Sequence, residues 1–193
     1  MAEIRSSLEI AMEKADKLGK SDKREMEIQS WMDKGRRLGA KYLRESGVEL
    51  RKSMDDISPD HISHVLGGVM EVLIRNIFLP KDEVQKDTVK KAMKGLIEIK
   101  GSVVNAVTSQ IEQLIDAYEQ TKKHYYEQLK SQMQSQLGGV KEAMAMQYGD
   151  AMADAIKPDA LPQFQEQWSK MSSEIDGQFD RQLSALKSAF ESL

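Results

Sequence analysis

A single apolar stripe at helical spacing runs through residues 81–157, a stretch that contains no proline. Of 19 stripe positions taken from Val89 to Ala155 in steps of three or four, 17 are apolar, and the exceptions are Lys100 and Thr121. The 18 steps cover 66 residues, a mean period of 66/18 or 3.67 residues. This is the period of an α-helix and excludes a strand. It also indicates straight helix pairing rather than a left-handed leucine zipper.

Prolines and glycines divide the chain into five predicted helices, at about residues 3–18, 21–46, 59–79, 81–157 and 162–192. Gly19 is expected to end the first helix, and the long fourth helix is expected to continue through Gly101 but to bend or break near Gly138-Gly139. The predicted fold is therefore all-α, an elongated helical bundle or long helical hairpin without a sheet. Residues 1–79 would hold the N-terminal helices with an apolar central helix. Residues 80–193 would hold the long helix and a returning amphipathic helix, all in one cooperative domain.

Small residues occur in pairs at positions where helices could approach one another closely. The string LGGV occurs at residues 66–69 and again at 137–140, and Gly35 and Gly39 are four residues apart. Because glycine has no side chain beyond hydrogen, we interpret these pairs as sites of close backbone contact between helices. An internal duplication is the less favoured interpretation, since little else aligns around the two LGGV strings.

Composition excludes several classes of function. The chain has no cysteine, so disulfides, thiolate nucleophiles and cysteine-ligated metals are absent. It has no nucleotide-binding glycine motif and no nucleophile-elbow motif, so the sequence gives no catalytic residues, no cofactor and no enzyme assignment. The opening residues contain acids and no apolar core, unlike a signal peptide. The most apolar window, residues 65–79, is too short and too charged to span a bilayer. We therefore expect a cytoplasmic protein.

His61 and His64 lie three residues apart at the start of the third predicted helix, close to Asp60. Histidines at this spacing share one helix face, so a metal site is geometrically conceivable. The sequence, however, lacks the helical metal signatures that pair glutamate with histidine. A solvated helix start is the favoured interpretation, and we predict no metal site.

A row of bases on the second predicted helix is a candidate anion-binding site. Its members fall at steps of three, four and three residues and are Lys34, Arg37, Lys41 and Arg44. Such a row could follow phosphates of nucleic acid or an anionic membrane. The chain as a whole carries a net charge of −3, and residues 142–193 are acidic. Contact with that acidic segment, or simple solvation, is favoured over nucleic acid or a membrane.

The leading functional hypothesis is a non-enzymatic helical scaffold or interaction protein that associates with itself, as a homo-oligomer, or with another helical protein. The candidate interaction surface consists of Ile111, Leu114, Ile115, Tyr118, Trp168, Ile175 and Phe179. An alternative is an amphipathic coat protein, similar to phasins, whose last helix binds lipid droplets or polymer granules. The polar side of that helix carries few bases, which favours a neutral surface over an anionic one.

The opening segment MAEIRSSLEIAMEKADKLG resembles the start of a set of short bacterial helical proteins without assigned activity. The resemblance covers about the first 20 residues, which form an ordinary amphipathic helix. It implies a bacterial, cytoplasmic protein of unknown role and assigns no functional residues.

Overall fold

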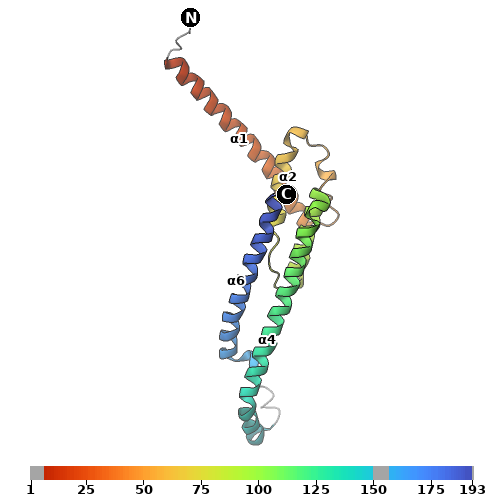
Figure 1. Ribbon diagram of the computed structural model, residues 1–193, viewed down its shortest axis with the longest axis vertical. Helices are drawn as coiled ribbons and strands as arrows, with labels where there is room; N and C mark the ends of the chain where they lie inside the picture. The colour runs from red at the N-terminus through yellow and green to blue at the C-terminus, as the bar shows by residue number, and fades with distance from the viewer. Residues whose placement is uncertain (1–6, 150–156, 193) are drawn as a thin grey trace. The chain divides into compact units, whose positions relative to one another are not determined.

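The computed structural model describes residues 7–149 and 157–192 (Figure 1). Within these ranges it contains five α-helices, short 3-10 helices and no strand, which confirms the all-α prediction. The α-helices are α1 (Ser7–Arg44), α2 (Pro59–Arg75), α3 (Glu83–Lys100), α4 (Asn105–Tyr148) and α6 (Pro162–Ser192). The 3-10 helices are η1 (Lys52–Met54), η2 (Gly101–Val104) and η3 (Pro158–Ala160).

The chain forms two compact units. The first unit comprises Met1–Ile77 and Val84–Val104, and it contains α1, α2 and α3. The second comprises Phe78–Glu83 and Asn105–Leu193, and it contains α4 and α6. Helix α3 thus packs in the first unit, although it follows the division that the sequence suggests after residue 79.

Helix α1 is continuous where the sequence predicted two helices. It runs from Ser7 to Arg44 and passes through Gly19, which was expected to end the first helix. A glycine inside a helix costs only about 1 kcal/mol relative to alanine. The residues on both sides of Gly19 are mostly strong helix formers, and no proline lies nearby. The local cost is therefore too small to stop the helix.

The predicted long helix is present as α3 and α4, which are joined directly by η2. The junction lies at Gly101, where φ is +74°, a left-handed conformation that glycine adopts readily. The long helix therefore continues past Gly101 as expected, with one 3-10 turn at the junction. Gly138 and Gly139, where a bend or break was expected, lie inside α4, and nothing lies within 4 Å of a Cβ built on either one.

Helix α2 begins as predicted, with Pro59 as its first residue after Ser58. It ends at Arg75 rather than at Leu79. The side-chain amide of Asn76 donates a hydrogen bond of 2.8 Å to the carbonyl oxygen of Val72. This bond satisfies one of the free carbonyls at the helix end. Pro80 also disfavours helical backbone in the residue before it.

The first unit is held together by the buried side of α2 and by α3. The buried apolar residues of these two helices are Val65, Val69, Leu73, Val89, Ala92, Met93 and Leu96. Gly95 of α3 lies directly against Tyr42 of α1 and Leu73 of α2, since a Cβ built on it would be 2.8 Å and 3.0 Å from their side chains. All three helices of the unit therefore meet at this glycine.

In the second unit α6 runs beside α4 (Figure 1). Leu129 and Met133 of α4 and Phe164 of α6 form a buried cluster. Partly buried side chains surround it, namely Tyr126, Leu137, Leu161 and Trp168. The large side chains of the α6 stripe thus find an apolar partner within the same chain.

Candidate functional site

Helices α1 and α2 pack with their backbones in direct contact. A Cβ built on Gly35 of α1 would overlap the carbonyl oxygen of Val65, and one built on Gly68 of α2 would overlap the carbonyl oxygen of Met32. Gly39 also faces α2, with the Val72 side chain 3.1 Å from its built Cβ. These three glycines confirm the predicted close approach. Gly67 has no neighbour within 4 Å and takes no part in it.

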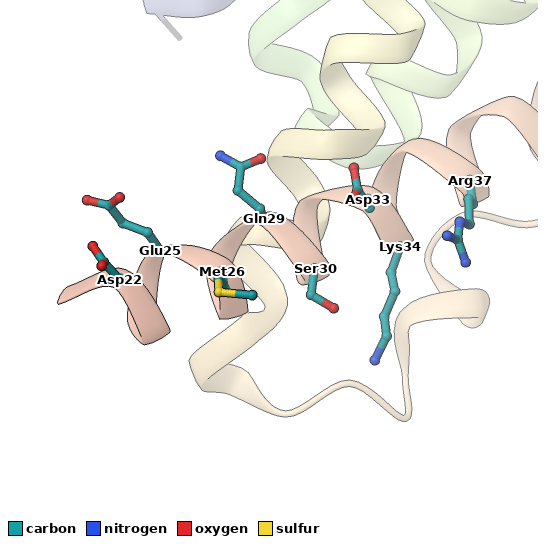
Figure 2. Close-up of a pocket in the computed structure, with 8 residues that line it drawn as sticks. All are labelled: Asp22, Glu25, Met26, Gln29, Ser30, Asp33, Lys34 and Arg37. Carbon is teal, nitrogen blue, oxygen red and sulfur yellow. The ribbon is translucent and has the colours of Figure 1, made fainter. Parts of the chain in front are cut away.

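The opposite side of α1 is uncovered and forms the main candidate surface, which we call the outer face. It is lined by Asp22, Glu25, Met26, Gln29, Ser30, Asp33, Lys34 and Arg37. All eight belong to α1 (Figure 2) and all are exposed. They line an open groove of about 750 Å³. Since position 35 faces α2, the spacing of 100° per residue places the outer face on the far side of the helix.

The residues that line the two ends of the outer face carry opposite charges. Asp22 and Glu25 stand at its N-terminal end, and Lys34 and Arg37 stand at its C-terminal end. The largest apolar group between them is Met26, which is 73% exposed. Three of these four residues, Asp22, Glu25 and Arg37, form no ion pair with another described side chain. The face is therefore a dipolar surface whose charges are available to a partner.

Two charged residues of the outer face have partners within α1 or close to it. Asp33 accepts a hydrogen bond of 2.6 Å from the Arg36 guanidinium, which also binds Glu71 of α2 at 2.7 Å. These bonds raise the pKa of Arg36, the bond to Glu71 contributing most. The Lys34 ammonium lies 3.6 Å from the centre of the Trp31 ring, a cation–π contact that leaves the lysine exposed.

The structure brings the predicted anion-binding residues together on one exposed side of α1. Lys34 and Arg37 lie on the outer face, and Lys41 and Arg44 continue the row toward the end of the helix. The Lys41 ammonium is 3.9 Å from the Glu45 carboxylate. Arg44 donates a hydrogen bond of 3.3 Å to the carbonyl oxygen of Ala40. Of the four residues in this row, only Lys41 has an acidic partner among the described residues, so the row keeps most of its positive charge.

His61 stacks on Trp31, with ring centres 4.3 Å apart and planes inclined by 12°. Its Nε2 atom lies 3.8 Å from a carboxylate oxygen of Glu27. Among the residues that the structure describes, no three histidine or acidic side chains converge as metal ligands would. His61 therefore contributes to the α1–α2 contact.

A lysine of α3 caps the C-terminal end of α1. The Lys91 ammonium donates hydrogen bonds of 3.1 Å and 3.0 Å to the carbonyl oxygens of Leu43 and Glu45. A cation at this end of a helix satisfies free carbonyls and complements the helix dipole. Burial raises the pKa of the neighbouring Tyr42, and the charge of Glu98 adds to the effect. This contact fixes α3 against α1.

The predicted interaction surface lies on α4 and α6 in the second unit. Five of its members are buried, namely Ile111, Ile115, Tyr118, Ile175 and Phe179. Leu114 and Trp168 are half-buried. A partner that used this surface would have to displace neighbours that now cover it. In the same way, a coat function for α6 would require its apolar stripe to leave α4.

A partly buried polar cluster joins α6 to α4. The Tyr118 hydroxyl donates a hydrogen bond of 2.8 Å to Asp176, and the Lys122 ammonium donates to Asp176 at 3.1 Å and to the Tyr118 oxygen at 3.2 Å. Burial, followed by the hydrogen bond to Asp176, raises the pKa of Tyr118 well above its usual value. Tyr118 also packs edge-on against Phe179. Its polar end and its ring both hold α6 in place.

A second cluster repeats this arrangement eight residues along α4. Tyr126 donates a hydrogen bond of 3.3 Å to Asp159, and Lys130 lies 3.7 Å from the same carboxylate. Our sequence reasoning did not identify either cluster. The available signal was a tyrosine with a lysine four residues later, which occurs at Tyr118 and again at Tyr126.

No helix in the described ranges, 7–149 and 157–192, combines the length and the apolar character needed to cross a bilayer.

Comparison with known proteins gives one match. Residues 51–192 match the model of a family of unknown function, DUF6657. The match includes α2, α3, α4 and α6 and begins after α1. It corrects the resemblance drawn from the opening segment, since the first 20 residues lie outside it. No curated protein and no solved structure matches the chain.

Proposed function

The chain belongs to this family, for which no activity is known, and we therefore propose a function from its geometry: a non-enzymatic helical interaction protein that binds a partner along the outer face of α1. The proposal concerns this chain alone, because α1 lies outside the residues that match the family. The observation that carries it is the outer face itself, which is exposed along its whole length and bears unpaired charges at both ends.

The rigidity of α1 supports this proposal. At Gly35 and Gly68 the contact between α1 and α2 is made by backbone atoms, which cannot change rotamer. The ion pair between Arg36 and Glu71 and the two Lys91 hydrogen bonds hold α1 further. A surface held in one conformation loses less entropy on binding than a mobile one. The outer face is thus preorganised for a helical partner.

A photo-crosslinking residue placed at Gln29 in the full chain tests this function in the native cell. Gln29 lies at the middle of the outer face, and Gln113, an exposed residue of α4, is the matched control position. We expect irradiation to give a discrete protein adduct from position 29 and none from position 113. Equal adducts from both positions, or no adduct from position 29, would refute the proposal.

A second candidate function is anion binding through the row Lys34, Arg37, Lys41 and Arg44. It is favoured by the absence of an acidic partner for Lys34 and Arg37 among the described residues. Binding of a labelled single-stranded RNA should then weaken steeply between about 50 and 200 mM salt. A flat response, or no binding at the lower salt concentration, would dismiss this candidate.

A further inference from the structure

We propose, building on the function above, that the partner of the outer face is a second copy of this chain. The two copies would pair with their α1 helices antiparallel, related by a two-fold axis that passes between Gln29 and Ser30. Such an interface is isologous, because each copy contributes the same surface. The proposal rests on how charge is arranged along α1.

The charges of the outer face become complementary when one helix is reversed. Around a centre between residues 29 and 30, Asp22 lies level with Arg37 of the second copy, and Glu25 lies level with Lys34. The two-fold axis repeats both pairs at the other end of the interface. A parallel pair would instead place acids beside acids and bases beside bases, which is repulsive. The charge pattern therefore selects the antiparallel arrangement.

The angular positions of these charged residues around α1 show which of the two pairs can make a close contact across the interface. At 100° per residue, Asp22 and Arg37 fall within about 30° of the midline of the outer face, so their side chains can meet across the interface. Glu25 and Lys34 are nine residues apart and fall on opposite edges, about 180° from each other. They contribute attraction over a longer distance. The Asp22–Arg37 pair is thus the main determinant of register.

The middle of the interface is compatible with this pairing. Gln29 and Ser30 are uncharged, and next to the axis Gln29 of each copy lies level with Ser30 of the other. Met26, the most exposed apolar residue of the face, lies level with Asp33 of the second copy. Asp33 is already paired with Arg36 of its own chain, so its charge is partly neutralised. No unpaired charge lies at the centre of the face.

Sedimentation of the full chain tests the proposal. Because the interface is polar, we expect a monomer–dimer equilibrium in the micromolar range that weakens at least about fivefold between 50 and 500 mM salt. Lys34→Glu/Arg37→Glu makes the whole face acidic and should weaken the dimer by about tenfold or more. The control Lys90→Glu/Lys94→Glu changes the net charge by the same amount on exposed residues of α3 and should leave the dimer unchanged.

A mixing experiment makes the charge test specific. Asp22→Lys/Glu25→Lys makes the face basic and should be monomeric alone, as should Lys34→Glu/Arg37→Glu. All cross-interface pairs are attractive between the two variants, so an equimolar mixture should form a heterodimer at least as tight as the native dimer. Failure of the mixture to associate while the native chain dimerises would refute the proposed pairing.

Cysteine crosslinking tests the direction of the helices, because the native chain has no cysteine. In the antiparallel dimer the two copies of Gln29 lie next to the axis, whereas the two copies of Met26 are about 10 Å apart along the helices. Gln29→Cys should form disulfide-linked dimers on mild oxidation, and Met26→Cys should not, since a disulfide needs Cα atoms within about 7 Å. The reverse result would indicate a parallel pair and overturn the proposal.

The results separate this inference from the proposed function. A native chain that stays monomeric at several hundred micromolar in low salt refutes self-pairing. If position 29 still crosslinks to a different protein in the cell, the outer face keeps its function and only the identity of the partner is wrong. If position 29 crosslinks to nothing, both fail.

Discussion

Replacing Gly68 by alanine tests the backbone contact that fixes α1. A methyl group at this position would overlap the carbonyl oxygen of Met32 and would lie 3.0 Å from the backbone nitrogen of Arg36. Neither backbone atom can rotate away, so the two helices must separate by roughly an ångström to restore ordinary contacts. We expect this separation to destabilise the first unit.

The size of the effect follows from the side chains that share the interface. Val65, Val69 and Leu73 of α2 are at most 1% exposed, and burial of each contributes about 1.5–3 kcal/mol. A gap of 0.5–1 Å forfeits roughly a quarter to a half of the contact energy. For three side chains the loss is about 1–4 kcal/mol. The gain of about 1 kcal/mol in helix propensity offsets part of it.

Gly67→Ala is the matched control, because it makes the same change one residue earlier in the same helix with nothing within 4 Å. It should stabilise the unit by about 0.5–1 kcal/mol. Guanidinium unfolding of both variants in a Trp168→Phe background isolates the signal of Trp31, the one tryptophan left. Midpoints that move in opposite directions with unchanged slopes support the reasoning. Equal stabilisation by both substitutions would show that α1 and α2 are not in backbone contact.

Three further predictions concern α4 and its junction with α3. Ile115→Asp places a charge at a side chain that is 4% exposed and should cost several kcal/mol, so an unchanged melting temperature would show that this side of α4 is not buried. Tyr118→Phe removes the hydroxyl that donates to Asp176 and should cost about 1–2 kcal/mol in urea unfolding. The pKa of Tyr118 in the folded state is raised above its unfolded value of 10.0. The stability that this tyrosine contributes is therefore present below pH 10 and is lost as the pH rises above 10. Between pH 9 and 11 the Tyr118→Phe variant should accordingly lose less stability than the native chain. Gly101→Ala should destabilise the protein by about 1 kcal/mol, because φ at this position is +74°. Gly138→Ala should stabilise it by a similar amount, because the new methyl group meets no neighbour. Equal shifts in melting temperature for the two variants would contradict the left-handed turn at Gly101.

The extent to which the sequence predicted the structure is clearest at the glycines. The prediction of close helix contact is confirmed at Gly35, Gly39 and Gly68, but it is wrong at Gly138 and Gly139, which have no neighbour within 4 Å of a built Cβ. Gly19, which was expected to end a helix, lies inside α1, whereas the long helix continues past Gly101 as expected, through one 3-10 turn. A glycine costs a helix about the same free energy at any interior position. Whether the chain turns there depends on what the following segment packs against, which local pattern does not encode.

The candidate site shows a similar limit. The row of bases from Lys34 to Arg44 could be predicted from its spacing alone, because a continuous helix determines which residues lie on the same side. The acidic end of the outer face was missed, since Asp22 was assigned to the start of a separate helix. Asp176 and Asp159 could not be paired with Tyr118 and Tyr126 from sequence, because the register between α4 and α6 depends on packing of large side chains such as Phe164 and Phe179.

The two units are interleaved along the chain, and this affects how the protein can be synthesised and dissected. The polypeptide leaves the first unit after Ile77, returns to it at Val84 and leaves it again after Val104. A ribosome must therefore translate past residue 104 before the N-terminal helices can meet α3. No single proteolytic cut or truncation yields both halves intact. Fragment studies would have to retain residues 84–104 with the N-terminal portion, joined by a linker that replaces residues 78–83.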